Sequence, residues 1–207
     1  MASKQAAVSE PVSEPVATER PAEAERPMRA DARRNYERLL QAGRAVLAER
    51  GSEASMEEIA RRADVGVGTL YRHFPRRIDL VEAVYREDVD GLVELARTVN
   101  QQPGPWQGLV DWLAGFVKYG QSKRVFLTEL HEAFEKNPDL ALNSREKIAA
   151  AVATVLTRAQ QAGLARTDID AADLMQLIGG MCMARNASLA QNERLLQLVL
   201  DGVRTGG

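Results

Sequence analysis

The chain has 207 residues, of which 27% are charged and 45% hydrophobic, and this balance is typical of a globular protein with a buried core. Its formal net charge is -2, so nucleic-acid binding would depend on a local basic surface and not on the overall charge. The single cysteine, Cys182, excludes an internal disulfide, and two histidines with one cysteine exclude a standard protein zinc site.

No apolar run is long enough for a membrane span, and the N-terminus lacks the charged-then-apolar pattern of a signal peptide. We therefore expect a cytoplasmic protein with no membrane partner and no cofactor. Cys182 lies between two methionines in an apolar run, and we interpret it as a small buried hydrophobic residue. A redox-sensing thiol is the alternative.

Residues 1–28 are dominated by proline, glutamate, alanine and serine, and they contain no aromatic residue. The sequence Val-Ser-Glu-Pro occurs twice, at 8–11 and at 12–15. A segment of this composition buries too little apolar surface to offset the entropy of ordering. We predict that 1–28 is a disordered tail.

From Ala30 onward, apolar residues recur at three- and four-residue spacings without the alternation of a strand, which predicts an all-α protein. Nine helices are expected in two parts. A three-helix head spans 29–76, and its function extends to about 86 through the start of a connecting helix. A bundle then fills 87–207. The expected helices cover 31–50, a segment starting at Ser55, 67–73, 76–98, 106–119, 123–135, 139–162, 170–189 and 192–204.

The segment from Ser55 to Arg77 contains two short predicted helices separated by a short turn, which is typical of a helix-turn-helix. Ser55 and Glu58 have the S-x-x-E spacing that begins a helix. Five basic residues and one acid lie between Arg61 and Arg77, so this segment carries the local positive charge that DNA phosphates require.

The sequence ARRADVGVGTLYRHF, from Ala60 to Phe74, resembles the DNA-binding head of the TetR (tetracycline repressor) family, with its Ala-x-x-Ala-Gly-Val-Ser-x-Gly-Thr-Leu-Tyr-x-His-Phe pattern. The resemblance covers about 31–86. Asp64 replaces a common turn glycine, and aspartate tolerates left-handed backbone geometry. Gly66 replaces a common serine cap, and glycine is an acceptable cap.

The resemblance implies a DNA-binding surface. Thr69 and Tyr71 would contact the backbone and bases, His73 and Arg77 would bind phosphates, and Val67 would meet a thymine methyl group. We expect phosphate contacts to dominate affinity; the alternative for Tyr71 is a packing role. The full predicted set is Ser55, Val67, Gly68, Thr69, Tyr71, Arg72, His73, Arg76 and Arg77.

The sequence over about 105–200 is similar to the C-terminal domain of an SbtR-like subgroup of the same family, which implies a helical bundle and a dimer. The resemblance to the TetR family implies that this bundle also binds a small effector. Apolar stripes in the last two predicted helices suit a two-fold interface, although a core within one chain would show the same stripes. The predicted interface is Leu174, Ile178, Gly179, Met181, Leu195, Leu198 and Val199. The predicted effector pocket, for which a packed core is the alternative, is Trp112, Phe116, Tyr119, Phe126, His131 and Met175.

These features predict a homodimeric repressor that binds a palindromic double-stranded DNA operator and is released by an unidentified small molecule. A transcriptional activator, or an architectural DNA-binding protein that needs no effector, is the alternative. The sequence has no G-x-S-x-G motif, phosphate-binding loop or metal cluster, so we expect no enzymatic activity.

Overall fold

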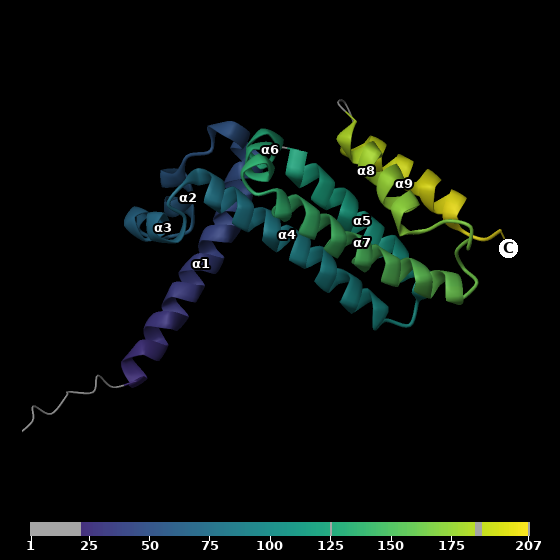
Figure 1. Ribbon diagram of the computed structural model, residues 1–207, viewed down its shortest axis with the longest axis horizontal. Helices are drawn as coiled ribbons and strands as arrows, with labels where there is room; N and C mark the ends of the chain where they lie inside the picture. Colours follow the sequence, from purple (N-terminus) through teal and green to yellow (C-terminus); the bar gives the residue numbers. More distant parts are fainter. Residues whose placement is uncertain (1–21, 125, 185–187, 207) are drawn as a thin grey trace, which may run out of the picture. The chain divides into compact units, whose positions relative to one another are not determined.

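The computed structural model describes residues 22–124, 126–184 and 188–206, and in these ranges it contains nine α-helices, as predicted (Figure 1). The chain divides after Arg34 into a short N-terminal unit and a second unit of residues 35–207, which holds all the surfaces discussed below. The helices are α1 (Ala22–Arg50), α2 (Met56–Arg62), α3 (Val67–His73), α4 (Arg77–Asn100), α5 (Pro105–Arg124), α6 (Leu127–Lys136), α7 (Pro138–Gln161), α8 (Ala171–Met183) and α9 (Leu189–Val203).

The turn between α2 and α3 has the geometry that its sequence predicts. Asp64 has a φ of 51°, in the left-handed region that aspartate tolerates better than most residues. Gly66 caps α3, and its carbonyl accepts hydrogen bonds from the amides of Thr69 (2.8 Å) and Leu70 (3.0 Å). The α2 cap is also present, because the Ser55 hydroxyl accepts from the Glu58 amide at 3.1 Å.

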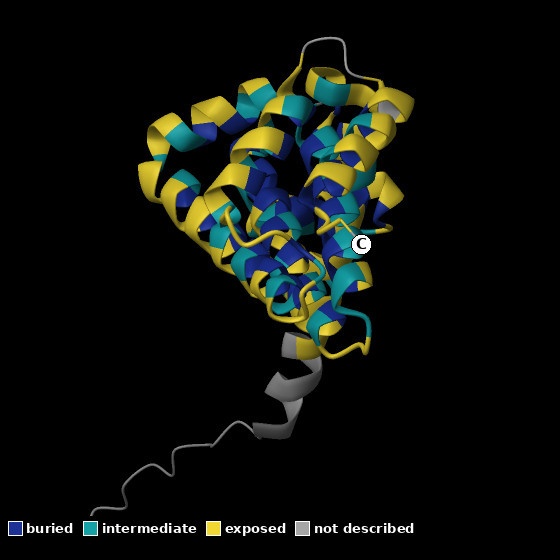
Figure 2. Ribbon diagram, turned by 90° about the vertical axis from the view of Figure 1, so that its right-hand side faces the viewer, coloured by how far each residue is buried: buried dark blue, intermediate teal, exposed yellow. Residues whose placement is uncertain are grey.

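Helices α4 to α9 form a bundle with a continuous apolar core. Helix α4 packs against α5, α6 and α7, and α8 packs against α5, α7 and α9. Figure 2 shows the buried residues between the helices and the exposed residues on their outer faces. The indole nitrogen of Trp112 donates to the Leu92 carbonyl at 3.0 Å, which ties α5 to α4. None of the described helices is long and apolar enough to cross a lipid bilayer.

Several helix ends differ from the prediction. Helix α1 begins at Ala22 and not at 31, in a stretch of alanine and glutamate, which favour helix. Residues 1–21 of the predicted tail lie outside the described residues. Helix α5 continues to Arg124, five residues past the predicted 119. Helix α8 ends at Met183 instead of 189.

The start of α9 shows why its predicted position, 192, was wrong. The helix begins at Leu189, and the Ser188 hydroxyl accepts from the Gln191 amide at 3.2 Å. Ser188 and Gln191 have the S-x-x-Q spacing of a capping box, a signal that the apolar periodicity alone did not reveal.

Candidate nucleic-acid interface and internal cavity

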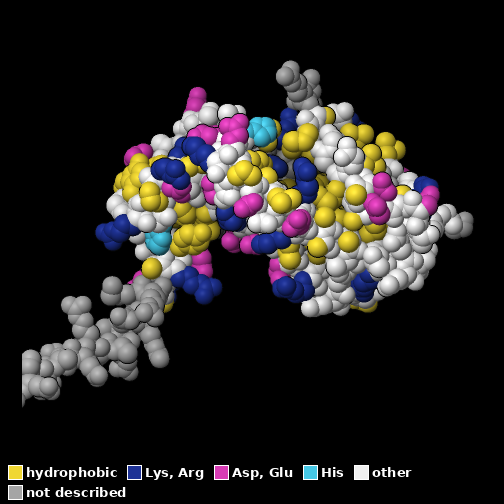
Figure 3. Space-filling view, viewed as in Figure 1, with side chains coloured by type: hydrophobic (Ala, Val, Ile, Leu, Met, Phe, Trp, Pro, Cys, Tyr) yellow, Lys and Arg dark blue, Asp and Glu magenta, His cyan; other side chains and the backbone are white. Residues whose placement is uncertain are grey.

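One face of α3 is buried and the other is presented to solvent. Leu70 is buried against the head, together with Phe74 just beyond the helix end. Val67 and Tyr71 are each 41% exposed, and Gly68 and Arg72 are also exposed. Figure 3 shows basic side chains on the surface of the head, where α2 and α3 lie. This outer face therefore offers a methyl-bearing side chain, a phenol and a guanidinium to a ligand.

Two predicted contact residues on α3, Thr69 and His73, are only half exposed. The His73 ring lies edge-on to the Tyr36 ring of α1, with 5.8 Å between ring centroids. The centroids of the Tyr36 and Phe74 rings are also only 5.3 Å apart. The imidazole is thus held in place by an aromatic cluster between α1 and the end of α3.

The Tyr71 hydroxyl donates a hydrogen bond to the Glu57 carboxylate of α2 at 3.2 Å. This bond raises the pKa of the Tyr71 phenol above its usual value, because the carboxylate stabilises the protonated hydroxyl. A phosphate that accepted from Tyr71 would have to compete with Glu57.

Arg76 and Arg77 are adjacent in sequence but have different surroundings. The Arg76 guanidinium is exposed and pairs with Asp79 at 2.6 Å. Hydrogen bonding from Arg76 lowers the pKa of the Asp79 carboxyl. Because the Arg76 side chain remains at the surface, it stays a candidate for a phosphate contact.

The Arg77 guanidinium, which the sequence assigns to a phosphate, is turned inward. It donates to the carbonyls of Ala54 and of Gly51, the latter at 2.9 Å, and to Glu129 of α6 at 3.0 Å. The Gly51 carbonyl also accepts from the Ala54 amide at 3.2 Å, so the Arg77 fork adds a second donor to it and donates to the Ala54 carbonyl of the same loop. We therefore correct the role of Arg77 from phosphate binding to anchoring α4 against the head and α6.

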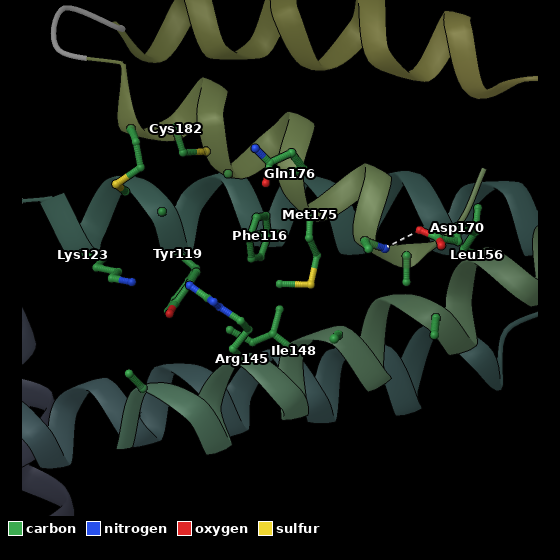
Figure 4. A pocket seen from close by; sticks show the side chains of 18 of the residues that line it. Phe116, Tyr119, Lys123, Arg145, Ile148, Leu156, Asp170, Met175, Gln176 and Cys182 are labelled. Carbon is green, nitrogen blue, oxygen red and sulfur yellow. Dashed lines mark hydrogen bonds between the residues drawn. The ribbon is translucent and has the colours of Figure 1, made fainter. Parts of the chain in front are cut away.

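The bundle contains an open-sided cavity of about 860 Å³ whose walls come from α4, α5, α6, α7 and α8 (Figure 4). Three of the predicted pocket residues, Phe116, Tyr119 and Met175, line it. Tyr85 of α4 also lines it, so the helix that starts at Arg77 forms part of the wall. The volume falls within the range of about 300–1,000 Å³ that is usual for small-molecule sites.

The other three predicted pocket residues lie elsewhere. Trp112 and Phe126 are buried in the packed core, and His131 is exposed on α6. Sequence reasoning also missed Lys123, which lines the cavity, because it ended the helix at 119. Lys123 is one helical turn beyond Tyr119 and so shares its face, a signal that the correct helix length would have provided.

The predicted interface residues separate into two groups. Leu174 and Ile178 are 2% and 0% exposed and belong to the core of the chain itself, and Gly179 is half-exposed and lines the cavity. The outer groove between α8 and α9 is apolar, and Figure 3 shows apolar side chains on the surface over α8. Its lining includes Met181, Leu195, Leu198 and Val199, together with Leu177, which is 54% exposed.

A helix-turn-helix with an exposed second helix, carried on a helical bundle, defines a DNA-binding transcriptional regulator. Comparison with protein-family models agrees with this class. Residues 39–84 match the model described as bacterial regulatory proteins, tetR family, and residues 104–205 match the model for the C-terminal domain of SbtR-like transcriptional regulators. The chain belongs to the TetR family.

Individual relatives support the same assignment. The HTH-type transcriptional regulator UidR of Escherichia coli is 26% identical over 193 residues, which cover 86% of this chain and 97% of UidR. A TetR transcriptional regulator from Streptomyces coelicolor has a crystal structure that is 35% identical, with a TM-score of 0.75, covering 83% of this chain and 99% of that chain. A TetR regulatory protein from Mycobacterium vanbaalenii is 32% identical, with a TM-score of 0.68, covering 86% and 100%.

Proposed function

We propose that this TetR-family regulator is a homodimeric repressor that binds a palindromic operator and releases it when a small molecule occupies the bundle cavity. The observation that carries the proposal is the position of α4. Its first residue, Arg77, anchors the head, and Tyr85 of the same helix lines the cavity. The two residues are eight positions apart, a rise of about 12 Å along a helix.

The head would bind DNA through the exposed face of α3. Val67 and Gly68 would meet base edges, while Tyr71, Arg72 and Arg76 would contact phosphates. Ser55, Thr69 and His73 flank this face. With so few long polar side chains toward the bases, specificity would rest on Val67, Thr69 and the sequence-dependent shape of the DNA.

Two heads are needed because a palindromic operator presents two half-sites about 34–36 Å apart. The apolar groove between α8 and α9 is the surface that suits a second copy. Leu198 is 66% exposed there, and large exposed apolar side chains in a contiguous groove are typical of an interaction surface.

The test begins with selection of bound DNA from a random pool, which would return a palindrome with its half-site spacing. Transcription in vitro from a promoter that carries this palindrome would then be measured with and without the protein. Repression predicts fewer transcripts when the protein is added. An increase in transcripts would favour an activator, and a selected sequence without two-fold symmetry would contradict the dimer.

A further inference from the structure

Two basic side chains from different helices point toward the same end of the cavity. Lys123 is on α5 and Arg145 is on α7, and Figure 4 shows both beside Tyr119. The Lys123 ammonium lies 5.4 Å, 5.8 Å and 5.6 Å from the ring centroids of Tyr85, Tyr119 and Phe134. Aromatic faces attract a cation, so these three rings hold the ammonium at the cavity wall.

This positive charge is not balanced by a carboxylate. Among the described residues, neither Lys123 nor Arg145 takes part in an ion pair. Asp170, the one acidic residue among the described residues of the cavity wall, lies toward the opposite end in Figure 4. There it caps α8 by accepting from the amides of Ala172 (2.8 Å) and Asp173 (3.0 Å). A partly buried cation without a partner is costly, and an anion from outside the chain would remove that cost.

Burial, and to a smaller extent the Asp88 carboxylate of α4, raises the pKa of the Tyr119 phenol at this end of the cavity. The Asp88 carboxylate itself pairs with Arg44 at 2.7 Å. Burial and the neighbouring Arg145 charge both lower the pKa of the Lys123 ammonium. The Arg145 charge therefore disfavours the charged form of Lys123, and an anion bound between them would offset this repulsion.

The cavity wall between this cationic end and Asp170 has a different character. Ile148 and Leu156 of α7 and Met175 of α8 line this stretch, with Leu156 beside Asp170 in Figure 4, together with alanines at 149 and 153. Side chains of this type are flexible or small and offer aliphatic surface, which suits an extended hydrocarbon chain. The cavity thus combines a cationic end with an aliphatic stretch, beside which Thr157, Gln160 and Gln176 add polar groups.

We propose that the cavity binds an amphipathic carboxylate, with its head group on Lys123 and Arg145 and an unbranched aliphatic chain along Ile148, Leu156 and Met175. As the identity of the effector, this inference rests on the proposed function; as a binding site, it stands on the geometry of the cavity alone. The guanidinium of Arg145 has the planar donor fork that matches a carboxylate.

The test uses the full-length protein and two probes that differ only in the head group, decanoate and decan-1-ol. Titration calorimetry would measure both dissociation constants at neutral pH. We expect decanoate to bind at least tenfold more tightly. Equal binding of the two probes, or no binding of decanoate, would overturn the inference.

Three variants locate the head group. Lys123→Met and Arg145→Gln should each reduce the preference for decanoate, and the double variant should abolish it. Lys118→Met is the matched control, because Lys118 is an exposed lysine of α5 outside the cavity wall, and it should retain the full preference. Arg145 is exposed, so Arg145→Gln keeps the test valid even if Lys123→Met unfolds. A preference that survives in Arg145→Gln and in a folded double variant would contradict the assignment.

The same probes added to the operator complex separate this inference from the proposed function. Selective decanoate binding that leaves the complex intact would support the site and contradict effector-controlled release. Release by decanoate and decan-1-ol at equal concentrations would support release and contradict the carboxylate site. Release by decanoate alone would support both.

Discussion

The guanidinium of Arg77, at the first position of α4, donates to the carboxylate of Glu129 on α6 at 3.0 Å. Both side chains are largely shielded from solvent, with 26% and 17% of their surfaces exposed. The same guanidinium holds the loop before α2 through the carbonyls of Gly51 and Ala54. One side chain thus connects the DNA-binding head, α4 and the bundle.

Removing the acceptor should therefore destabilise the protein. We expect Glu129→Ala to lower the free energy of unfolding by about 1–2 kcal/mol, because a charge-assisted hydrogen bond of low exposure is lost. Urea unfolding would measure this. Glu132→Ala on the same helix removes an exposed pair with Lys136 and should cost less than about 0.5 kcal/mol. Equal losses in the two variants would show that the hydrogen bond between Arg77 and Glu129 stabilises the protein no more than an exposed ion pair does.

The corrected role of Arg77 leaves Arg72 as the exposed arginine of α3 for a phosphate contact. We expect Arg72→Ala to weaken operator binding and to reduce the slope of log affinity against log salt by about 0.9 per head. Fluorescence anisotropy over a salt series would measure the slope. Arg97→Ala, at an exposed position near the far end of α4, should leave it unchanged. An unaltered slope in Arg72→Ala would remove this residue from the interface.

Gly68 offers a test of how closely DNA approaches α3. A Cβ added at Gly68 would meet no atom within 4 Å, so Gly68→Ala should fold normally and gain about 0.5–1 kcal/mol of helix stability. Operator affinity should nevertheless fall, because the new methyl group would occupy the surface that we propose to face the bases.

The matched control for Gly68→Ala is Gly91→Ala, in α4, where an added Cβ also meets nothing within 4 Å. It should gain similar stability in thermal unfolding and retain full operator affinity. If Gly68→Ala binds the operator as tightly as the wild type, the bases do not come close to this position.

The dimer can be tested at Leu198. We expect the wild type to sediment as a dimer and Leu198→Glu to sediment as a monomer, because a charge would be buried in the apolar groove between α8 and α9. Operator affinity should fall with it. Leu142→Glu, at another exposed leucine 56% accessible on α7, should remain dimeric. A dimeric Leu198→Glu protein would place the interface elsewhere.

Carboxylate binding should depend on pH through Lys123. Because the pKa of its ammonium is lowered from 10.5, decanoate affinity should begin to fall at a pH below 10.5 as the charge is lost. Other groups at the cavity have pKa shifts of their own: burial raises the pKa of the Tyr119 phenol, of the Cys182 thiol and of the Asp88 carboxyl, so a variant that lacks the lysine is needed to assign the effect to Lys123. Calorimetry across pH 7 to about 10 would measure it. Lys123→Met should give a flat profile, and the same decline in that variant would assign the effect to another group.

The sequence predicted the class of fold and the position of the helix-turn-helix because these depend on local signals. Ser55, Asp64 and Gly66 act within a few residues of themselves, through a cap or a turn, and the structure places each as expected. The all-α class follows from periodicity in the same way.

The direction of long side chains could not be predicted in this way. Arg77 resembles a phosphate ligand in sequence, but its partners lie 23, 26 and 52 positions away along the chain. Leu174 and Leu198 both belong to apolar stripes in the sequence. The packing of α8 and α9 buries Leu174 and exposes Leu198, and the stripes alone do not show this difference. Lys123 and Arg145 come together across two helices, a relationship that periodicity within one helix does not contain.

Trp112, which ties α5 to α4, also stacks on Phe116, with 5.6 Å between ring centroids and planes inclined by 11°. Phe116 faces the cavity, while Trp112 itself is shielded from water. A ligand that displaces Phe116 therefore changes the surroundings of a buried indole without touching it. The intrinsic fluorescence of the protein can report on cavity occupancy, with no label and no DNA present.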